Sequence, residues 1–331
     1  MNNTYFPVRY SQLSPDALKE ELLKRYDLAE NLSCRLFDSG INDIYIIKTD
    51  EDTFYLRITQ AGKYSKIDYE EEVLIINTLC KNGIRAAAPM CCKDGNYIWE
   101  INAFEGVRYA VLFNEAKNKP SEDNVKKHYN LGRMLAQIHA ISDEKNFKVS
   151  RVPIDLMQLA YNPLEKVKPY LEHRKVDYDF LKDATDKLSK FVEQIGYEKP
   201  YYGYCHGDIH SGNVFFNEDE PMVFDFDCMG YGWRAYDICV YAWNETAGDE
   251  TYIEKEPWKV FLEGYNSVRQ LNEHELLAIH AFGALRDLWL MGLHVDVIEK
   301  NAGCSWYNDG YFDFRINIFK LWYERVFPVN K

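Results

Sequence analysis

The feature that most constrains this chain is a short polar loop, His206-Gly207-Asp208-Ile209-His210-Ser211-Gly212-Asn213. It is followed closely by Val223–Asp227, in which two aspartates alternate with apolar residues. An aspartate within an apolar strand is costly to bury unless it has a partner. The intervening residues have the pattern of a β-hairpin, with strands at 214–216 and 222–226 and a turn at 217–220. The sequence therefore predicts a loop and a hairpin that bring carboxylates and an amide together.

The spacing within this loop favours one kind of chemistry. Transfer of a phosphoryl group to a hydroxyl requires an acceptor for the hydroxyl proton and oxygen ligands for a metal that binds the phosphates. In kinases an H-x-D-x-x-x-x-N loop supplies the acceptor and one ligand, and a second aspartate on a following strand supplies another ligand. Asp208 and Asn213 have this spacing, and Asp225 has the place of the second aspartate. Asp227 either supports these ligands or contacts the metal itself.

Three motifs together resemble the aminoglycoside phosphotransferase/choline kinase superfamily. Its members show H-G-D-x-H-x-G-N-V, then a strand ending in D-F-D or D-W, then Y-D, which is here Tyr236-Asp237. The resemblance implies a two-lobed protein-kinase-like fold with ATP and Mg²⁺ as cofactors. It also implies that His206 and Asp237 support the loop and that His210 belongs to it. The implied site residues are Asp208 and His206 for catalysis and Asn213, Asp225 and Asp227 for metal binding.

Nucleotide binding is expected in the first part of the chain. Ser39, Gly40 and Asn42 lie in a strand–turn–strand pattern, where a glycine-containing turn can present backbone N–H groups to phosphates. The turn matches part of the family's S-G-x-x-N-x-x-Y/F loop. The next strand carries Arg57 where kinases place a phosphate-contacting lysine, and an arginine retains the charge. The resemblance pairs Arg57 with a glutamate of the following helix, Glu72.

Two alternatives at this position stay open. Glu70 and Glu71 rival Glu72, because one helical turn cannot be fixed from the sequence. Arg57 could instead extend from its strand to solvent, and Lys48 would then be another candidate cation.

The distribution of patterns predicts an α+β architecture with an antiparallel-sheet N-terminal lobe, residues 1–113, and a mostly helical C-terminal lobe, residues 114–331. A hinge is expected at about 112–117, where it overlaps a polar linker at 114–123, with a cleft between the lobes. The expected strands are 34–37, 44–48, 53–58, 90–92, 97–101 and 109–113, and the expected helices are 15–26, 67–81, 125–139, 184–195 and 273–298.

Composition excludes several function classes. A net charge of −13 argues against a nucleic-acid partner, because phosphate binding requires a basic face. Eight scattered cysteines without a C-x-x-C pair indicate free thiols rather than a disulfide framework or a zinc site. The first ten residues lack a signal-peptide pattern. The apolar runs 109–113 and 238–243 are too short to cross a bilayer. A cytoplasmic enzyme without membrane contact is expected.

The acceptor is predicted to be a small molecule with a hydroxyl group, and a cationic amino alcohol or amino sugar is favoured. Acids and aromatic rings of the second lobe can hold an ammonium by ion pairing and cation–π contact. These candidates are Trp233, Asp287, Trp289, Trp306, Tyr307 and Asp309. Against this, Leu285, Leu288 and Gly292 share helical spacing with Trp289, which is typical of core packing.

Three other functions remain open. The same residues would serve a kinase of protein Ser/Thr hydroxyls. A regulatory pseudokinase is suggested only by the arginine at position 57. A metallohydrolase would use His206, Asp208 and His210 as alternating metal ligands on a strand, although the neighbouring glycines favour a loop.

Overall fold

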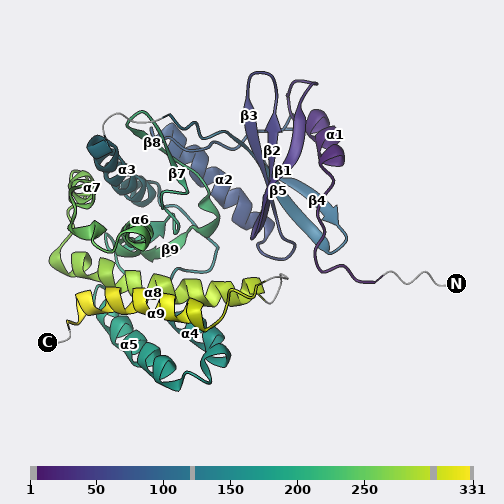
Figure 1. Ribbon diagram of the computed structural model, residues 1–331. Coiled ribbons are helices and arrows are strands. Elements are labelled where there is room, and N and C mark those ends of the chain that lie inside the picture. Colours follow the sequence, from purple (N-terminus) through teal and green to yellow (C-terminus); the bar gives the residue numbers. More distant parts are fainter. Residues whose placement is uncertain (1–5, 120–123, 299–303, 329–331) are drawn as a thin grey trace. The chain divides into compact units, whose positions relative to one another are not determined.

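The computed structural model describes residues 6–119, 124–298 and 304–328, and the chain divides into two compact units (Figure 1). The first unit contains residues 1–118 together with the short segments 148–151 and 222–224. The second contains 119–147, 152–221 and 225–331. The first unit thus extends past the expected boundary at residue 113. Of the expected polar linker 114–123, residues 120–123 lie outside the described residues.

The first unit is built on a five-stranded antiparallel sheet in the order β1-β2-β3-β5-β4. Arg57 pairs with Ile44 of β2 on one side and Val111 of β5 on the other, so it lies in the middle of the sheet. The register of β1 against β2 shifts between Leu36 and Asp38, just before the turn into β2. The strands are β1 (Ser33–Ser39), β2 (Asn42–Lys48), β3 (Thr53–Thr59), β4 (Trp99–Ala103) and β5 (Gly106–Asn114).

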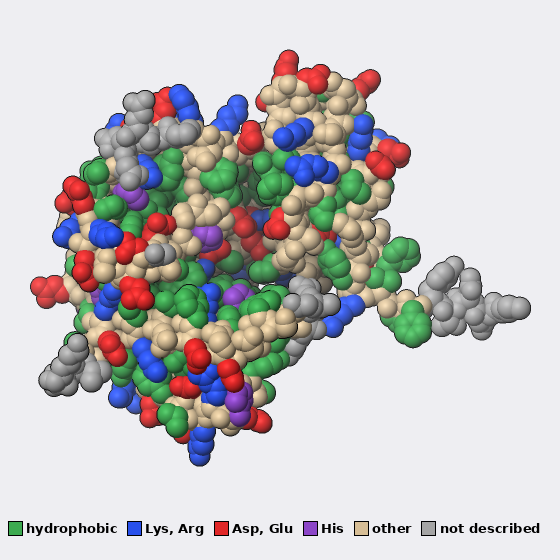
Figure 2. Space-filling view, viewed as in Figure 1, with side chains coloured by type: hydrophobic (Ala, Val, Ile, Leu, Met, Phe, Trp, Pro, Cys, Tyr) green, Lys and Arg blue, Asp and Glu red, His purple; other side chains and the backbone are tan. Residues whose placement is uncertain are grey.

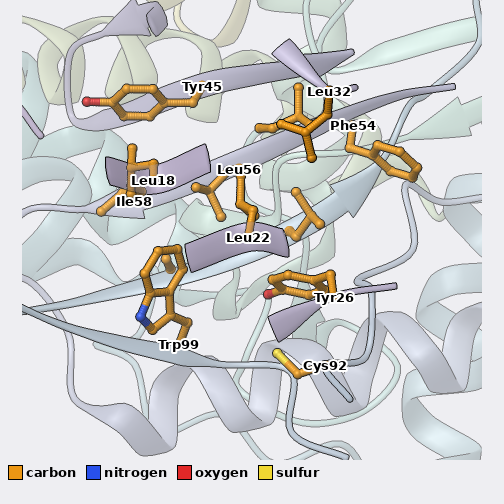
Figure 3. Packing of buried hydrophobic residues seen from close by; sticks show 13 residues of the cluster. Leu18, Leu22, Tyr26, Leu32, Tyr45, Phe54, Leu56, Ile58, Cys92 and Trp99 are labelled. Atoms are coloured by element: carbon orange, nitrogen blue, oxygen red, sulfur yellow. The ribbon is translucent and has the colours of Figure 1, made fainter. Parts of the chain in front are cut away.

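Two helices cover opposite faces of this sheet. Helix α1 (Pro15–Arg25) buries Leu18 and Leu22 in a cluster that includes Leu112 of β5 (Figure 3). Helix α2 (Lys66–Lys81) packs Tyr69 and Val73 against Val111, the preceding residue of the same strand. Successive side chains of a strand point to opposite faces, so the two helices bury the two sides of β5.

Local sequence explains where both helices begin. Ser14 accepts a hydrogen bond from the Ala17 N–H, and Pro15 occupies the first helical position of α1. Ser65 and Asp68 form a capping box at the start of α2. The Ser65 side chain bonds the backbone N–H of Asp68, and the Asp68 side chain bonds the backbone N–H of Ser65.

The expected strand at 90–92 is absent, and this prediction was wrong. The chain is extended here, and the Met90 N–H donates to the Leu112 carbonyl at 2.7 Å, but only isolated bridges form, such as Pro89 with Phe113. Proline has no N–H to donate to a ladder, which explains why the apolar run that follows Pro89 does not become a strand.

The second unit is mostly helical, with two small two-stranded sheets, β6–β9 and β7–β8. Its strands are β6 (Tyr202–Cys205), β7 (Val214–Asn217), the first half of β8 (Glu220–Val223) and β9 (Gly230–Trp233), and residues 222 and 223 of β8 belong to the first unit. Its helices are α3 (Asn124–Lys145), α4 (Asn162–Val167), α5 (Lys175–Glu193), α6 (Arg234–Gly248), α7 (Glu256–Asn266), α8 (Glu273–Ile298) and α9 (Asp309–Val326).

Helix α8 lies at the centre of the second unit, where it packs against α4, α5, α6 and α9. Among the described residues it alone is long and apolar enough to cross a membrane, with a mean hydropathy of 1.4 over its most apolar window. Because 67% of that window is buried inside the protein, its apolar character is explained by core packing.

The surface carries charges of both signs. Acidic and basic side chains are interspersed over the helical unit on the face shown in Figure 2, and the net charge is −13. All eight cysteines are free thiols, as expected from their spacing.

Candidate active site

The loop between β6 and β7 is held by Asp237, a fully buried carboxylate in the first turn of α6. Its two oxygens accept hydrogen bonds from the backbone N–H groups of His206 at 2.8 Å and Gly207 at 2.7 Å. His139 Nε2 lies 3.0 Å from the same carboxylate. Burial opposes ionisation of Asp237, but the hydrogen bonds from His139 and the Gly207 amide outweigh it and lower its pKa. Asp237 therefore anchors the backbone that leads into Asp208.

Gly207 is required by the path of this backbone. Its φ is +83°, in the left-handed region, and a Cβ at this position would lie 2.1 Å from the Cys228 carbonyl oxygen. A side chain would therefore force the loop away from the segment that follows Asp225.

Asp208 projects from the loop into a set of three donors. Arg286 Nη2 donates to Oδ1 of the carboxylate, and Asn213 Nδ2 donates to Oδ2 at 3.0 Å and to the Asp208 carbonyl at 2.9 Å. His210 Nε2 lies 3.5 Å from Oδ2. Burial would raise the pKa of Asp208, but the charge of Arg286 and the hydrogen bond of His210 outweigh it and hold the pKa well below its usual range. The group is a fixed carboxylate at neutral pH.

The two histidines of the motif have different surroundings. His206 is fully buried, its Nδ1 accepts from the Asp208 N–H at 3.3 Å, and its ring packs on Phe226 with centroids 4.6 Å apart. His210 accepts from the Gly212 N–H at 2.9 Å through Nδ1, which leaves the proton on Nε2, the nitrogen that faces Asp208. His206 thus orients the loop, and His210 is the histidine that faces the carboxylate. The contacts of His206 agree with the loop-supporting role that the resemblance implies, while its inclusion among the catalytic residues stays a prediction.

Asn213, Asp225 and Asp227 form a set of oxygen donors suited to a hard divalent cation. Asn213 uses Nδ2 to hold Asp208, so its Oδ1 remains for a metal. Asp225 follows β8 in the left-handed conformation, with φ 59° and ψ 70°, and its Oδ1 accepts from the Asp227 N–H at 3.4 Å. A non-glycine residue in this conformation is uncommon and is concentrated at functional sites.

The carboxylates of this region lie close together. The pKa of the Cys228 thiol is raised well above its usual value by burial and by the negative charges of Asp208, Asp227 and Asp225. The negative charges of Asp208, Asp225 and Asp227 thus all act on the half-buried Cys228 thiol, and a bound divalent cation would offset these like charges. The residues present therefore fit Mg²⁺, with Asn213, Asp225 and Asp227 as the groups that would hold it.

In the first unit, the turn between β1 and β2 carries Ser39, Gly40 and Asn42. The Gly40 N–H donates to the Asn42 carbonyl at 3.0 Å, and Gln60 Nε2 donates to the Gly40 carbonyl at 3.0 Å. Apart from Gly40 and its two chain neighbours, no heavy atom of the described residues lies within 4 Å of the place where a Gly40 Cβ would be, so one side of the turn is open among them. Phosphate binding by this turn stays a prediction from the sequence.

The turn is anchored by an ion pair that the sequence did not reveal. Arg108 of β5 is fully buried and donates to Asp43 at 2.7 Å. Its other donors reach the Thr59 carbonyl at 2.9 Å and the Ser11 carbonyl at 2.9 Å. Ser39 Oγ donates to Asp43 Oδ1 at 2.8 Å, which ties the turn to this anchor.

Arg57 pairs with Glu72, the helical partner favoured by the sequence, at 2.8 Å with both side chains buried. Glu70 is exposed and Glu71 bonds elsewhere, so the phase of α2 decides among the three glutamates. Arg57 does not extend to solvent. A second arginine, Arg151, donates to the same Glu72 oxygen at 2.6 Å.

The segment that carries Arg151 also holds the preceding residue of α2. Ser150 bonds Glu71 twice, through its N–H at 2.6 Å and its hydroxyl at 2.8 Å. Ser150 and Arg151 therefore bond Glu71 and Glu72, respectively, and these bonds tie the segment 148–151 to α2.

The candidate acceptor residues of the second unit are already engaged. Asp287 is fully buried and pairs with Arg315 at 3.1 Å. Asp309 pairs with His173 at 2.7 Å. Trp233 is fully buried and donates to the Gly196 carbonyl at 2.9 Å.

The aromatic candidates differ in exposure. Trp289 lies half-buried beneath Arg286, with the guanidinium 4.4 Å from its ring centroid. Tyr307 donates to the Met291 carbonyl at 3.1 Å, and Trp306 is 41% exposed. Leu285 and Leu288 are buried core residues, as helical spacing indicates.

Sequence reasoning missed Arg286, Arg151 and Arg108. Arg286 had a detectable signal, because a charge in the middle of a long apolar helix must find a partner. Arg151 and Arg108 had none, since their partners lie 79 and 65 residues away in the chain.

An antiparallel-sheet unit with a buried Arg–Glu pair, and a helical unit with an Asp/Asn loop followed by a second aspartate, define a kinase-like phosphotransferase. The sequence profile of the phosphotransferase enzyme family (APH) matches residues 33–270. The chain belongs to this family, and it is a phosphotransferase.

Relatives extend over nearly the whole chain. An uncharacterized protein of Synechocystis is 33% identical over 314 residues, covering 94% of this chain and 86% of its own length. Amicoumacin kinase of Bacillus subtilis is 23% identical and covers 85% of each chain. Homoserine kinase of Agrobacterium fabrum is 26% identical, covering 82% of this chain and 81% of its own.

Solved structures confirm the two-lobed kinase-like fold. An amicoumacin kinase in complex with AMP-PNP and Ca²⁺ has a TM-score of 0.74 at 22% identity, with 92% of each chain covered. A microcompartment-associated aminopropanol kinase has a TM-score of 0.72 at 19% identity, covering 94% of this chain and 95% of that one.

Proposed function

We propose that this protein transfers the γ-phosphate of ATP, in the presence of Mg²⁺, to the hydroxyl of a small amino alcohol. The observation that carries the proposal is the geometry of Asp208, whose carboxylate is fixed beside Asn213 in the loop that precedes Asp225. A fixed carboxylate can accept a hydrogen bond from the acceptor hydroxyl, orient its oxygen for attack, and take its proton as the new P–O bond forms.

The remaining groups have supporting roles in this proposal. Asn213, Asp225 and Asp227 would hold Mg²⁺, which neutralises charge on the phosphates when it is bound. Arg57, held by Glu72 at 2.8 Å, supplies a cation for the phosphates, and the β1–β2 turn supplies backbone N–H groups.

The names of several relatives support an acceptor that carries both an amine and a hydroxyl. Homoserine kinase and aminopropanol kinase are named for acceptors that carry both an amine and a hydroxyl, and an amicoumacin kinase structure contains AMP-PNP and a divalent cation. Trp306, which is 41% exposed, offers a ring face for an ammonium. The rings of Trp243 and Trp289 already face the Arg286 guanidinium, which lies 5.4 and 4.4 Å from their centroids. Asp287 and Asp309 are paired with other residues, so aromatic faces are favoured over these acids as the ammonium contact.

The test is a screen of hydroxyl-bearing amines with Mg-ATP. ADP release would be measured by a coupled assay, and the phosphorylated product would be identified by mass spectrometry. The panel includes aminopropanol, homoserine, ethanolamine, choline and spectinomycin, with each amine matched by an alcohol that lacks the amino group. Acceptor-dependent ADP release that Asp208→Asn abolishes supports the proposal. Equal rates with matched amines and plain alcohols would refute the amino-alcohol class.

A protein acceptor is the second candidate. The serine/threonine protein kinase RdoA of Salmonella typhimurium is 24% identical and covers 86% of this chain. The panel therefore carries a protein arm, with casein and the chain itself as acceptors. Phosphate incorporation into protein, without turnover of any small molecule, would favour this second function.

A further inference from the structure

Arg286 is a buried cation in the middle of the apolar helix α8. Its side chain is only 4% exposed, and its guanidinium lies 4.4 Å from the ring centroid of Trp289. Taking a guanidinium out of water is costly unless charge and hydrogen bonds compensate. A helix whose only structural task was core packing would be more stable with an apolar side chain here, so the contacts of Arg286 require an explanation.

The hydrogen bonds of Arg286 involve the proposed base, Asp208, and groups next to it. Arg286 Nη2 donates to Asp208 Oδ1, and Nη1 donates to the Gly207 carbonyl at 3.2 Å and to the Tyr236 hydroxyl oxygen at 2.6 Å. One planar group therefore bonds the side chain of the base and the backbone of the residue before it. This differs from Asp237, which bonds only the backbone of the loop.

The two oxygens of the Asp208 carboxylate are thus held by different residues. Oδ1 is bound by Arg286, and Oδ2 is bound by Asn213 at 3.0 Å. A carboxylate that is held at both oxygens cannot rotate about its Cβ–Cγ bond, so its remaining lone pairs keep one direction. A misplacement of about 1 Å in a reacting group can cost on the order of 100-fold in rate.

From this geometry, and resting on the proposed role of Asp208, we infer that Arg286 is a positioning residue for the base. Arg286 lies on α8, a helix far from the loop in sequence. Its hydrogen bond orients the Asp208 carboxylate toward the acceptor hydroxyl. Arg286 acts through Asp208 and does not bind the acceptor itself, since its guanidinium is buried between Trp289 and the loop. The fork of an arginine is needed, because the point charge of a lysine cannot reach both the carboxylate and the Gly207 carbonyl in this geometry.

The test is a double-mutant cycle between Arg286 and Asp208, with Mg-ATP and the acceptor that the screen identifies. If the screen identifies no acceptor, the Mg-dependent hydrolysis of ATP, with water as the acceptor, serves as the reaction. The variants are Asp208→Asn, Arg286→Met, Arg286→Lys and the double variant Asp208→Asn/Arg286→Met. Tyr236→Phe is the matched control, because it removes one hydrogen bond of Arg286 and leaves the carboxylate contact. Calorimetric titration with Mg-ATP reports whether each variant is folded and binds nucleotide.

We expect Arg286→Met to lower kcat by about 100-fold or more, with KM for ATP changed less than about threefold. Arg286→Lys should recover about tenfold of this loss, and Tyr236→Phe should stay within about threefold of wild type. In the Asp208→Asn background, Arg286→Met should add less than about threefold, because the residue acts through the base.

Independent, multiplicative losses in the double variant would overturn the inference, and so would an Arg286→Met variant with unchanged kcat. If Arg286→Met fails to bind Mg-ATP, the inference is tested with Arg286→Lys instead. A normal kcat in Arg286→Lys refutes the need for the forked guanidinium of arginine. The proposed function fails separately, since it requires that Asp208→Asn alone lower turnover by on the order of 10²–10⁴ whatever happens at Arg286.

Discussion

Two buried arginines share one carboxylate in the first unit, and this arrangement predicts unequal effects of removing its members. Arg57 and Arg151 donate to Glu72 Oε2 at 2.8 and 2.6 Å, and all three side chains are at most 6% exposed. Glu72→Gln leaves two buried guanidiniums without this negative charge. Arg57→Ala leaves the Glu72 charge still neutralised by Arg151.

The expected magnitudes follow from this difference. Glu72→Gln should destabilise α2 by about 3–5 kcal/mol, the cost of breaking a buried ion pair by removing one partner. Arg57→Ala should cost about 1.5–3 kcal/mol, the contribution of a hydrogen bond to a charged group. Arg35→Ala, which removes an exposed arginine from β1 of the same sheet, should stay within about 0.5 kcal/mol and is the matched control.

Amide hydrogen exchange, read on peptides covering Lys66–Lys81, measures these changes where they occur. The opening free energy of α2 should fall most in Glu72→Gln, less in Arg57→Ala and not measurably in Arg35→Ala. An Arg57→Ala variant as destabilised as Glu72→Gln would refute the reasoning, because it would mean that Arg151 does not neutralise Glu72.

Four further predictions concern the site and its surroundings. Asp208→Asn should lower turnover by on the order of 10²–10⁴ and leave Mg-ATP binding nearly unchanged, as steady-state kinetics and calorimetry would show. Asp225→Asn should weaken Mg-dependent ATP binding sharply, with unchanged circular dichroism in the metal-free protein; equal ATP binding with and without EDTA in the wild type would contradict this. Arg57→Ala should raise KM for ATP and lower kcat while Arg57→Lys keeps much of the activity, and unchanged kinetics in Arg57→Ala would show that another cation binds the phosphates. Burial raises the pKa of Asp287 to about 7 despite the charge of Arg315, so the native state binds a proton that the unfolded chain has lost above pH about 4. Stability should therefore fall as pH rises from about 4 to about 7, by up to about 4 kcal/mol, and Asp287→Asn should remove this part of the pH dependence measured by urea unfolding.

Much of the fold was predictable because its signals are local. Ser14 and Pro15 mark the start of α1, and the helix runs from Pro15 to Arg25 as its apolar spacing indicates. The strands β1, β2, β3 and β5 lie where β-branched and aromatic runs predict them. The prediction failed at 90–92, where Pro89 prevents a regular ladder.

The sequence by itself determined the chemistry of the loop. Asp208 and Asn213 lie five positions apart in one tight turn, and Asp225 follows across a short hairpin, so their proximity depends on short-range backbone geometry. A spacing of this kind can be read directly from the chain.

Tertiary structure alone decided which residues hold these groups. The phase of α2 selects Glu72 over its two neighbours, and Arg286 reaches Asp208 from a helix 78 residues further along the chain. The physical reason is that a buried charge must find a partner, but any of several charges can provide one. Which charge does so depends on how helices and strands pack, and that packing brings together residues whose separation in sequence carries no signal.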